Sequence, residues 1–167
     1  MIEQKKLKVS KVSMNKDNPR VFTKANINDI IRSLLTFPEM LHGIRAIAIK
    51  DNIVLGGNLR LKGLKSILDL SIEEIATIIA DNSKDKSENR ISYLVDYWTE
   101  FKTNKEMNFI IADNLTDQQA KEFLIRDNVS TGSWDMDMLA NNWDSEELND
   151  WGVNVWVADE EGEEEEE

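Results

Sequence analysis

The sequence contains no cysteine and only one histidine, His42, among its 167 residues. Without thiols the chain has no disulfide, no thiolate metal ligand and no cysteine nucleophile. A zinc site would depend almost wholly on carboxylates, so zinc is not expected, and His42 is interpreted as a turn residue. No apolar run approaches the length of a membrane span. These absences predict a cytoplasmic protein with no membrane partner.

Negative charge is plentiful but unevenly placed. Eight of the twelve excess negative charges lie in residues 159–167, where there is no basic residue, so the preceding residues carry a net charge of −4. We interpret residues 157–167 as a disordered acidic tail. Basic residues gather locally at 5–11 and at 60–65. This charge does not suit general coating of DNA, which needs a broad positive surface, but it permits a local anion site.

Hydrophobic periodicity predicts an α+β fold, with a small mixed β-sheet covered by helices. The predicted strands cover residues 7–12, 44–49, 53–55 and 107–112. The predicted helices cover residues 27–35, 59–68, 71–80, 91–101, 117–126, 135–142 and 145–150.

Local signals support several of these boundaries. Ser71 with Glu74 and Thr116 with Gln119 have the spacing of capping boxes, and Asn26 is expected to cap the first helix. The dipeptide Asp51-Asn52 indicates a hairpin turn between two strands.

The most informative stretch is the one in which the strand 53–55 runs into Gly56 and Gly57 and then into a helix. Glycine permits a tight turn and close approach of a ligand, and the first helical turn presents free N–H groups. Arg60 in that turn adds a planar donor group suited to phosphate. Together they predict a phosphate site. The alternative is that the two glycines serve only the geometry of the turn.

Three of the five tryptophans, Trp134, Trp143 and Trp151, lie near the C-terminus. They could stack on bases, or they could anchor short helices to the sheet by burying a large area; we expect the second, together with Leu139 and Leu148. The acidic residues beside these helices, at 135, 137, 144, 146 and 147, could bind a hard cation or cap the helices, and capping is expected. No metal site is therefore predicted.

Taken in order, Asn18-Pro19-Arg20, the helix that contains Ser33, the strand 44–49 and the run from Gly56 to Arg60 resemble the ParB N-terminal domain. The form is similar to the ParB-like nuclease proteins of phages and mobile elements, which have the ParB/sulfiredoxin-like fold. The strand 107–112, the helix 117–126 and Asp127-Asn128 resemble the family's strand, helix and Glu-Asn-x-x-Arg segment. The resemblance covers about residues 7–152. It implies one domain over 1–156, with a helical insertion at 69–103 and the C-terminal helices 135–151 packed on it.

The resemblance also implies which residues bind a ligand, namely a nucleoside triphosphate with Mg²⁺ or another nucleotide or nucleic acid. The implied phosphate contacts are Gly56, Gly57, Asn58, Arg60 and Asn128, with Arg20 closing the pocket. If the domain hydrolyses phosphoryl groups, the candidate catalytic carboxylates are Asp127 and Glu39.

The chain departs from the family at three positions. Gly57-Asn58-Leu59-Arg60 replaces Gly-Glu-Arg-Arg, and Thr131 replaces the arginine of Asn-x-x-Arg, so two cationic contacts are missing. Asn58 stands where sulfiredoxins carry their cysteine, so sulfiredoxin chemistry is excluded, since it needs a thiol.

Two functions therefore stay open. The first is binding of nucleotide or nucleic acid, with or without hydrolysis, and the intact glycine turn favours it. The second is a non-catalytic adaptor that binds a protein partner through its acidic surface and tail, and the missing cations favour that one.

Overall fold

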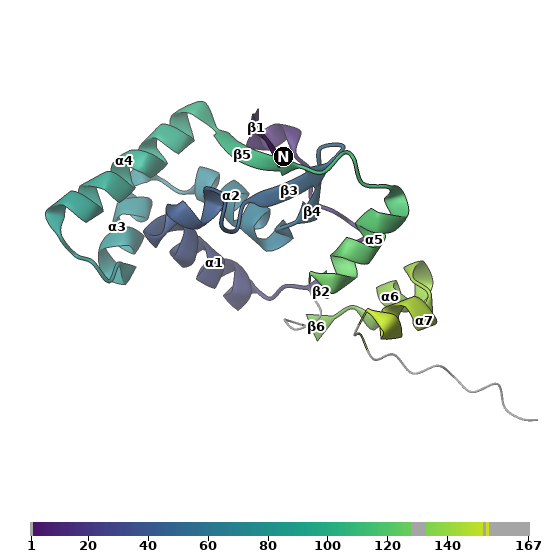
Figure 1. Cartoon of the computed structure of the whole chain (residues 1–167). Helices are drawn as coiled ribbons and strands as arrows, with labels where there is room; N and C mark the ends of the chain where they lie inside the picture. Colours follow the sequence, from purple (N-terminus) through teal and green to yellow (C-terminus); the bar gives the residue numbers. More distant parts are fainter. Residues whose placement is uncertain (1, 128–132, 152, 154–167) are drawn as a thin grey trace, which may run out of the picture.

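A computed structural model describes residues 2–127, 133–151 and 153 of the chain (Figure 1). Two sequence predictions lie outside these residues, namely the acidic tail at 157–167 and the binding role of Asn128. None of the helices in the described ranges is long and apolar enough to cross a membrane.

Four strands form a mixed open sheet, which confirms the expected α+β fold. They are β1 (Glu3–Lys8), β3 (Ile47–Lys50), β4 (Ile53–Gly56) and β5 (Glu106–Ile111), in the order β1-β5-β3-β4. Strand β5 is antiparallel to β1 and parallel to β3, and β3 is antiparallel to β4. Asp51 and Asn52 join β3 to β4 with φ of 53° and 62°, the left-handed pair of a two-residue hairpin turn, so the predicted hairpin is confirmed.

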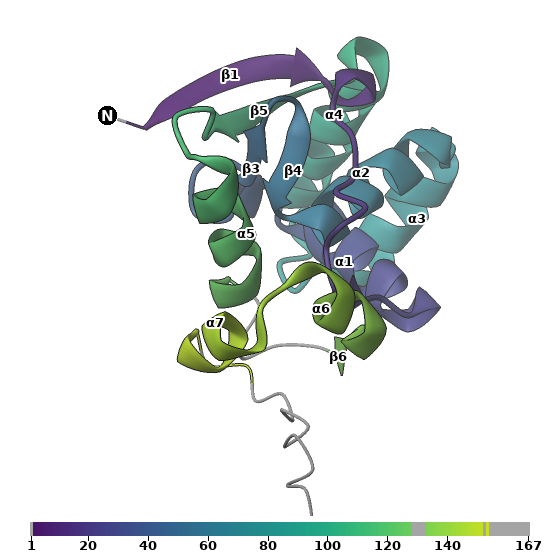
Figure 2. The ribbon, with the colours of Figure 1, turned by 90° about the vertical axis from the view of Figure 1, so that its right-hand side faces the viewer.

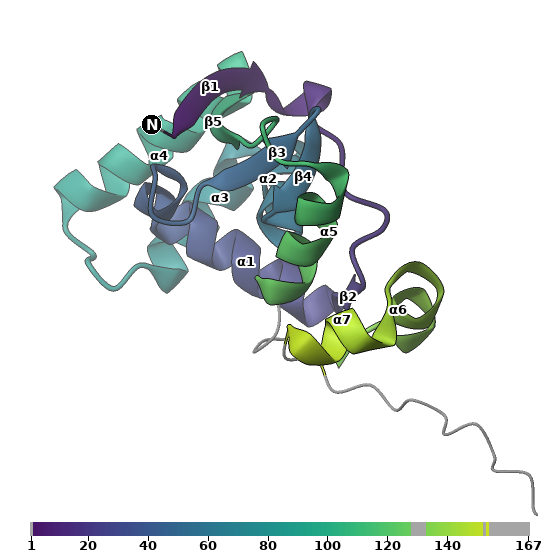
Figure 3. The ribbon, with the colours of Figure 1, turned by 45° about the vertical axis from the view of Figure 1, so that its right-hand side comes forward.

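Helices pack on both faces of this sheet (Figure 2, Figure 3). Ile47 and Ile49 of β3 lie in one apolar core, whereas Ala48 between them packs against a second. The first core is completed by α1 (Lys24–Thr36), α2 (Asn58–Asp69), α3 (Ile72–Asn82) and α4 (Glu88–Asn104). The second is completed by α5 (Asp117–Arg126), α6 (Met136–Asn142) and α7 (Ser145–Asp150).

The predicted strand at residues 7–12 is wrong in its position. Strand β1 ends at Lys8, and Val9–Lys11 forms a 3-10 turn, η1. Val9 and Val12 are both buried, and their spacing of three residues suits a 3-10 turn better than a strand. The strand predicted at 44–49 begins only at Ile47, because Ile44 lies in a loop and is 77% exposed.

Helix α1 begins earlier than predicted. Thr23, not Asn26, is its N-cap, and the Thr23 hydroxyl accepts from the Asn26 N–H at 3.1 Å. The Asn26 side chain accepts in return from the Thr23 N–H at 3.0 Å. Asn26 therefore completes a capping box from inside the first turn. The capping boxes at Ser71 and Thr116 are confirmed as predicted.

A second sheet, which the sequence did not predict, links the N-terminal loop to the C-terminal helices. It pairs β2 (Arg20–Val21) with β6 (Ser133–Trp134) in antiparallel register, and the Asp135 N–H donates to the Pro19 carbonyl at 2.5 Å. With only two residues in each strand, no periodicity could reveal it.

The C-terminal tryptophans pack as expected. Of the five residues predicted to anchor these helices, Leu139, Trp143 and Leu148 are buried in the second core, and Trp134 and Trp151 are partly buried and pack against it. The side chains of Asp135 and Asp144 accept hydrogen bonds from the first-turn N–H groups of α6 and α7, so their interpretation as caps is also confirmed.

Candidate anion-binding cavity

The turn from β4 into α2 is built from two glycines with different roles. Gly57 has φ of 106°, a left-handed conformation that favours glycine, and it occupies the N-cap of α2 without a side-chain cap. Gly56 gives room to a neighbour, since a methyl group there would lie 3.0 Å from Cε1 of Phe123 and 3.4 Å from Oδ2 of Asp127. The first turn of α2 therefore begins beside the end of α5, and its N-cap residue supplies no side-chain cap.

A cavity of about 360 Å³ opens at this turn. Its lining includes six of the eight residues that the sequence singled out, from segments far apart in the chain: Arg20, Gly56, Gly57, Asn58, Arg60 and Asp127. The remaining lining is mostly apolar and includes Phe22, Ile30, Met40, Leu55 and Leu59.

The charge of this lining is positive. Arg20, Arg45 and Arg60 contribute three guanidinium groups and Asp127 one carboxylate. The pKa of Arg60 is lowered to about 10, first by burial and then by repulsion from Arg45 and Arg20, while Asp127 acts in the opposite sense. Nε of Arg60 is buried and has no hydrogen-bond partner within the described part of the chain. Among the described residues, Asp127 is thus the charge that favours a protonated Arg60, and an anion in the cavity would favour it in the same way.

Arg20 is held in the lining of the cavity by its own loop. The Arg20 N–H donates to Oδ1 of Asn18 at 3.1 Å, and the guanidinium carbon lies 5.5 Å from the centre of the Phe22 ring. Pairing with Trp134 across β2 and β6 fixes the backbone. The Asn18-Pro19-Arg20 turn thus brings an arginine to the start of α2.

Arg45 is a lining residue that sequence reasoning missed. It lies in the loop before β3, and its N–H donates to the Met40 carbonyl at 2.7 Å. No motif surrounds it, and the only signal is its place just before a buried strand. The glycine turn has one arginine, Arg60, where the family that the chain resembles has two. The Arg45 guanidinium group adds a further cation to the same cavity.

Two of the predicted site residues have structural partners. Asn58 is 5% exposed, and its side chain accepts from the Asn15 N–H at 3.0 Å and donates to the Asn15 carbonyl at 3.4 Å. Glu39 is not among the lining residues of the cavity; it forms a two-point ion pair with Arg90, at 2.5 and 3.1 Å. The hydrogen bond from Arg90 lowers the pKa of Glu39. Asn58 therefore anchors a loop, and Glu39 joins η2 (Pro38–Leu41) to α4.

Within the described residues, no group of three or more acidic or histidine side chains could hold a metal ion. Comparison of the chain with protein-family models gives no match, and neither does comparison with curated proteins or with solved structures.

Proposed function

We propose that this chain is a ParB-like domain of phage or mobile-element type that binds the phosphate groups of a nucleotide or nucleic acid in the cavity at the start of α2. The observation that carries the proposal is the gathering of three arginines around a helix N-terminus whose N-cap is a glycine, in a chain whose net charge is −12. Concentrated positive charge inside an acidic protein favours a specific anion over general attraction to DNA.

Each group has a distinct role in this proposal. The first-turn N–H groups of α2 and the Arg60 guanidinium would hold phosphate oxygens, because a helix N-terminus and a buried arginine both favour negative charge. Arg20 and Arg45, which also line the cavity, would neutralise the remaining charge. The apolar lining around Phe22 would contact the rest of the ligand, and a volume of about 360 Å³ lies within the usual range of small-molecule sites.

Mg²⁺ fits this arrangement as a companion of the phosphates. It is usually held by one or two carboxylates together with phosphate oxygens and water. Asp127 is the carboxylate that lines the cavity. If hydrolysis occurs, Asp127 is the candidate that lies beside the ligand, whereas Glu39 is engaged by Arg90.

The alternative is a non-catalytic adaptor that keeps the fold and binds a protein. The engagement of Asn58 with Asn15 favours it, since an amide predicted to contact phosphate already has backbone partners. In that case the acidic surface and the acidic tail of the chain would contact the protein partner.

Thermal unfolding with ligand distinguishes the two functions. The intact chain is titrated with inorganic phosphate, with each nucleoside triphosphate with and without Mg²⁺, and with short DNA. A ligand at a hundred times its Kd should stabilise the protein by about 2.7 kcal/mol. Arg60→Ala should weaken binding about tenfold or more, because it removes a charge-assisted contact.

Lys62→Ala is the matched control. Lys62 lies on the same helix, is exposed and is not a lining residue of the cavity, yet its loss changes the net charge equally. Equal weakening by both variants would indicate diffuse attraction to a basic surface. Stabilisation by none of the ligands would reject the proposed function.

A further inference from the structure

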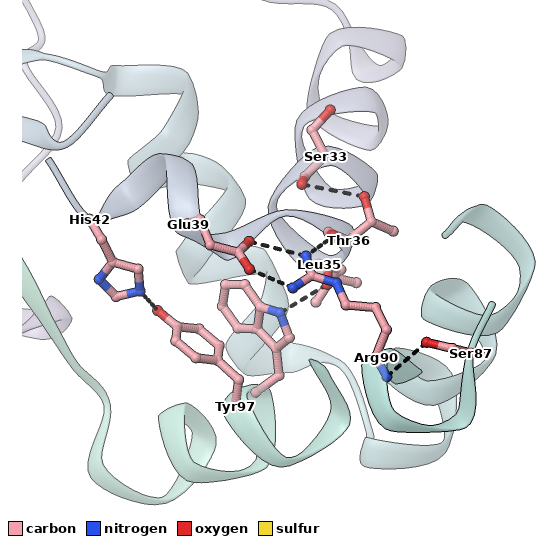
Figure 4. Close-up of polar contacts among 9 residues, drawn as sticks. Ser33, Leu35, Thr36, Glu39, His42, Ser87, Arg90 and Tyr97 are labelled. Carbon is pink, nitrogen blue, oxygen red and sulfur yellow. Dashed lines mark hydrogen bonds and ion pairs between the residues drawn. The ribbon is translucent and has the colours of Figure 1, made fainter. Parts of the chain in front are cut away.

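Helix α4 presents three side chains to the segment that ends α1 and forms η2 (Figure 4). Arg90, Tyr97 and Trp98 lie seven and eight residues apart, a spacing that places them on one face of a helix. Trp98 Nε1 donates to the Leu35 carbonyl at 3.1 Å, and the Tyr97 hydroxyl lies 3.0 Å from Nε2 of His42. The segment 35–42 is therefore held at both ends by α4.

Arg90 makes the strongest of these contacts. Its Nη1 lies 2.5 Å from Oε1 of Glu39, and its Nη2 lies 3.1 Å from both Oε2 of Glu39 and the Thr36 carbonyl. The pair is partly buried, with the Arg90 side chain 23% exposed. A two-point, charge-assisted contact of this kind fixes orientation as well as distance.

The segment held by Arg90 leads directly to the cavity. Met40, the residue after Glu39, lines the cavity, and its carbonyl accepts the Arg45 N–H at 2.7 Å. Arg45 also lines the cavity, and its charge repels that of Arg60. The position of Arg45 relative to Arg60 thus depends on the placement of η2.

We infer that Arg90 is a positioning residue for the anion site: by holding Glu39 and the Thr36 carbonyl it places η2 and, through the Met40 carbonyl, Arg45. This inference rests on the proposed function for its purpose, but the positioning itself needs no ligand. Arg90 does not line the cavity at the start of α2, and the carboxylate of Glu39 balances its charge. Its effect on an anion therefore passes through Arg45.

The first test measures backbone hydrogen exchange in the ligand-free protein. Arg90→Gln should speed exchange of the Arg45 amide by about tenfold, because its bond to Met40 opens more often when η2 loosens. Arg32→Gln is the control, since it breaks the Arg32–Asp29 ion pair on the exposed surface of α1. Equal exchange of the Arg45 amide in the two variants would overturn the inference.

The second test titrates inorganic phosphate into wild type, Arg90→Gln, Arg45→Ala and the double variant. Arg90→Gln should weaken phosphate binding about three- to tenfold in the wild-type background, and less than about twofold once Arg45 is absent. A purely structural role would give the same factor in both backgrounds and would overturn the inference. If the wild type binds neither phosphate nor nucleotide, the proposed function fails, and the exchange measurement alone decides the role of Arg90.

Discussion

The guanidinium group of Arg60 packs directly on the backbone of Gly57. A methyl group on the Gly57 Cα would lie 2.9 Å from Nη2 and 3.2 Å from Cζ of Arg60, and 3.2 Å from Cγ1 of Ile47. Gly57 therefore serves two purposes, since it allows the left-handed turn and leaves room for Arg60 beside the first turn of α2. The left-handed turn at Gly57 and the position of the Arg60 guanidinium group therefore depend on each other.

Gly57→Ala should accordingly lower both stability and anion affinity. The left-handed backbone and the crowding of Arg60 together should cost about 1–3 kcal/mol of unfolding free energy. Gly43→Ala is the matched control, because Gly43 has φ of 108° but open space around its Cα. Urea unfolding measures the two costs. A loss no greater than that of Gly43→Ala, with unchanged phosphate affinity, would contradict the packing role of Arg60.

Removal of the buried charge at Arg60 should stabilise the ligand-free protein. Its pKa of about 10 in the folded state lies below the ordinary value of 12.5, so folding disfavours the protonated form, and the penalty is present at every pH below about 10. Arg60→Met keeps an apolar stem and removes the charge, and it should raise the unfolding free energy by about 1 kcal/mol. The same variant should lose stabilisation by phosphate. A destabilised variant would mean that Arg60 is well compensated without a ligand.

The parts of the fold that could be predicted are those set by local chemistry. The capping boxes at Ser71 and Thr116 and the Asp51-Asn52 turn depend on residues three positions apart or fewer, and all three form as predicted. Strand β1 and the pairing of β2 with β6 depend on distant partners, namely β5 and the segment after α5. The sequence of one segment does not specify a distant partner, so the position of β1 and the pairing of β2 with β6 could not be predicted.

The residues of the candidate site also fall into two groups, those placed by the local sequence and those placed by distant contacts. That Gly57 and Arg60 lie in one turn could be predicted because the two residues are close together in the sequence, and both line the cavity. Arg45 was missed because it reaches the cavity only through the folding of η2 against α4. Asn58 has the position of a ligand contact in the sequence, but the loop at Asn15 comes within hydrogen-bond reach and engages its amide.

The second core should depend on Leu139. This side chain is fully buried, whereas Met136 on the same helix is 51% exposed. Leu139→Ala should lower the unfolding free energy by about 2–4 kcal/mol, because it leaves a cavity in the second core. Met136→Ala should change it by less than about 0.5 kcal/mol. Urea unfolding followed by tryptophan fluorescence measures both, and similar costs would show that α6 is not packed on the body.

Tyr97 should make the protein sensitive to alkaline pH. Burial, and after it the nearby Tyr93 and acidic residues, raises the pKa of Tyr97 from 10 to about 12. The folded state therefore retains this proton in a range where the unfolded state has lost it, so stability falls as pH rises from about 10 to about 12. Below pH 10 the folded and unfolded states both hold this proton, so the contribution of Tyr97 to stability is fully present.

Tyr97→Phe removes this titration together with the hydroxyl contact to His42. The stability difference between wild type and Tyr97→Phe should shrink by about 1–2 kcal/mol between pH 10 and 12, less than the full value of two pKa units because the side chain is only partly buried. Urea unfolding at pH 9, 10, 11 and 12 gives the difference directly, and the titration of Arg60 cancels because both proteins contain it. His42→Ala is the control, since it removes the partner of the hydroxyl and leaves the phenol buried. It should therefore keep the alkaline decline, and a decline that disappears in His42→Ala would assign the raised pKa to the hydrogen bond in place of burial.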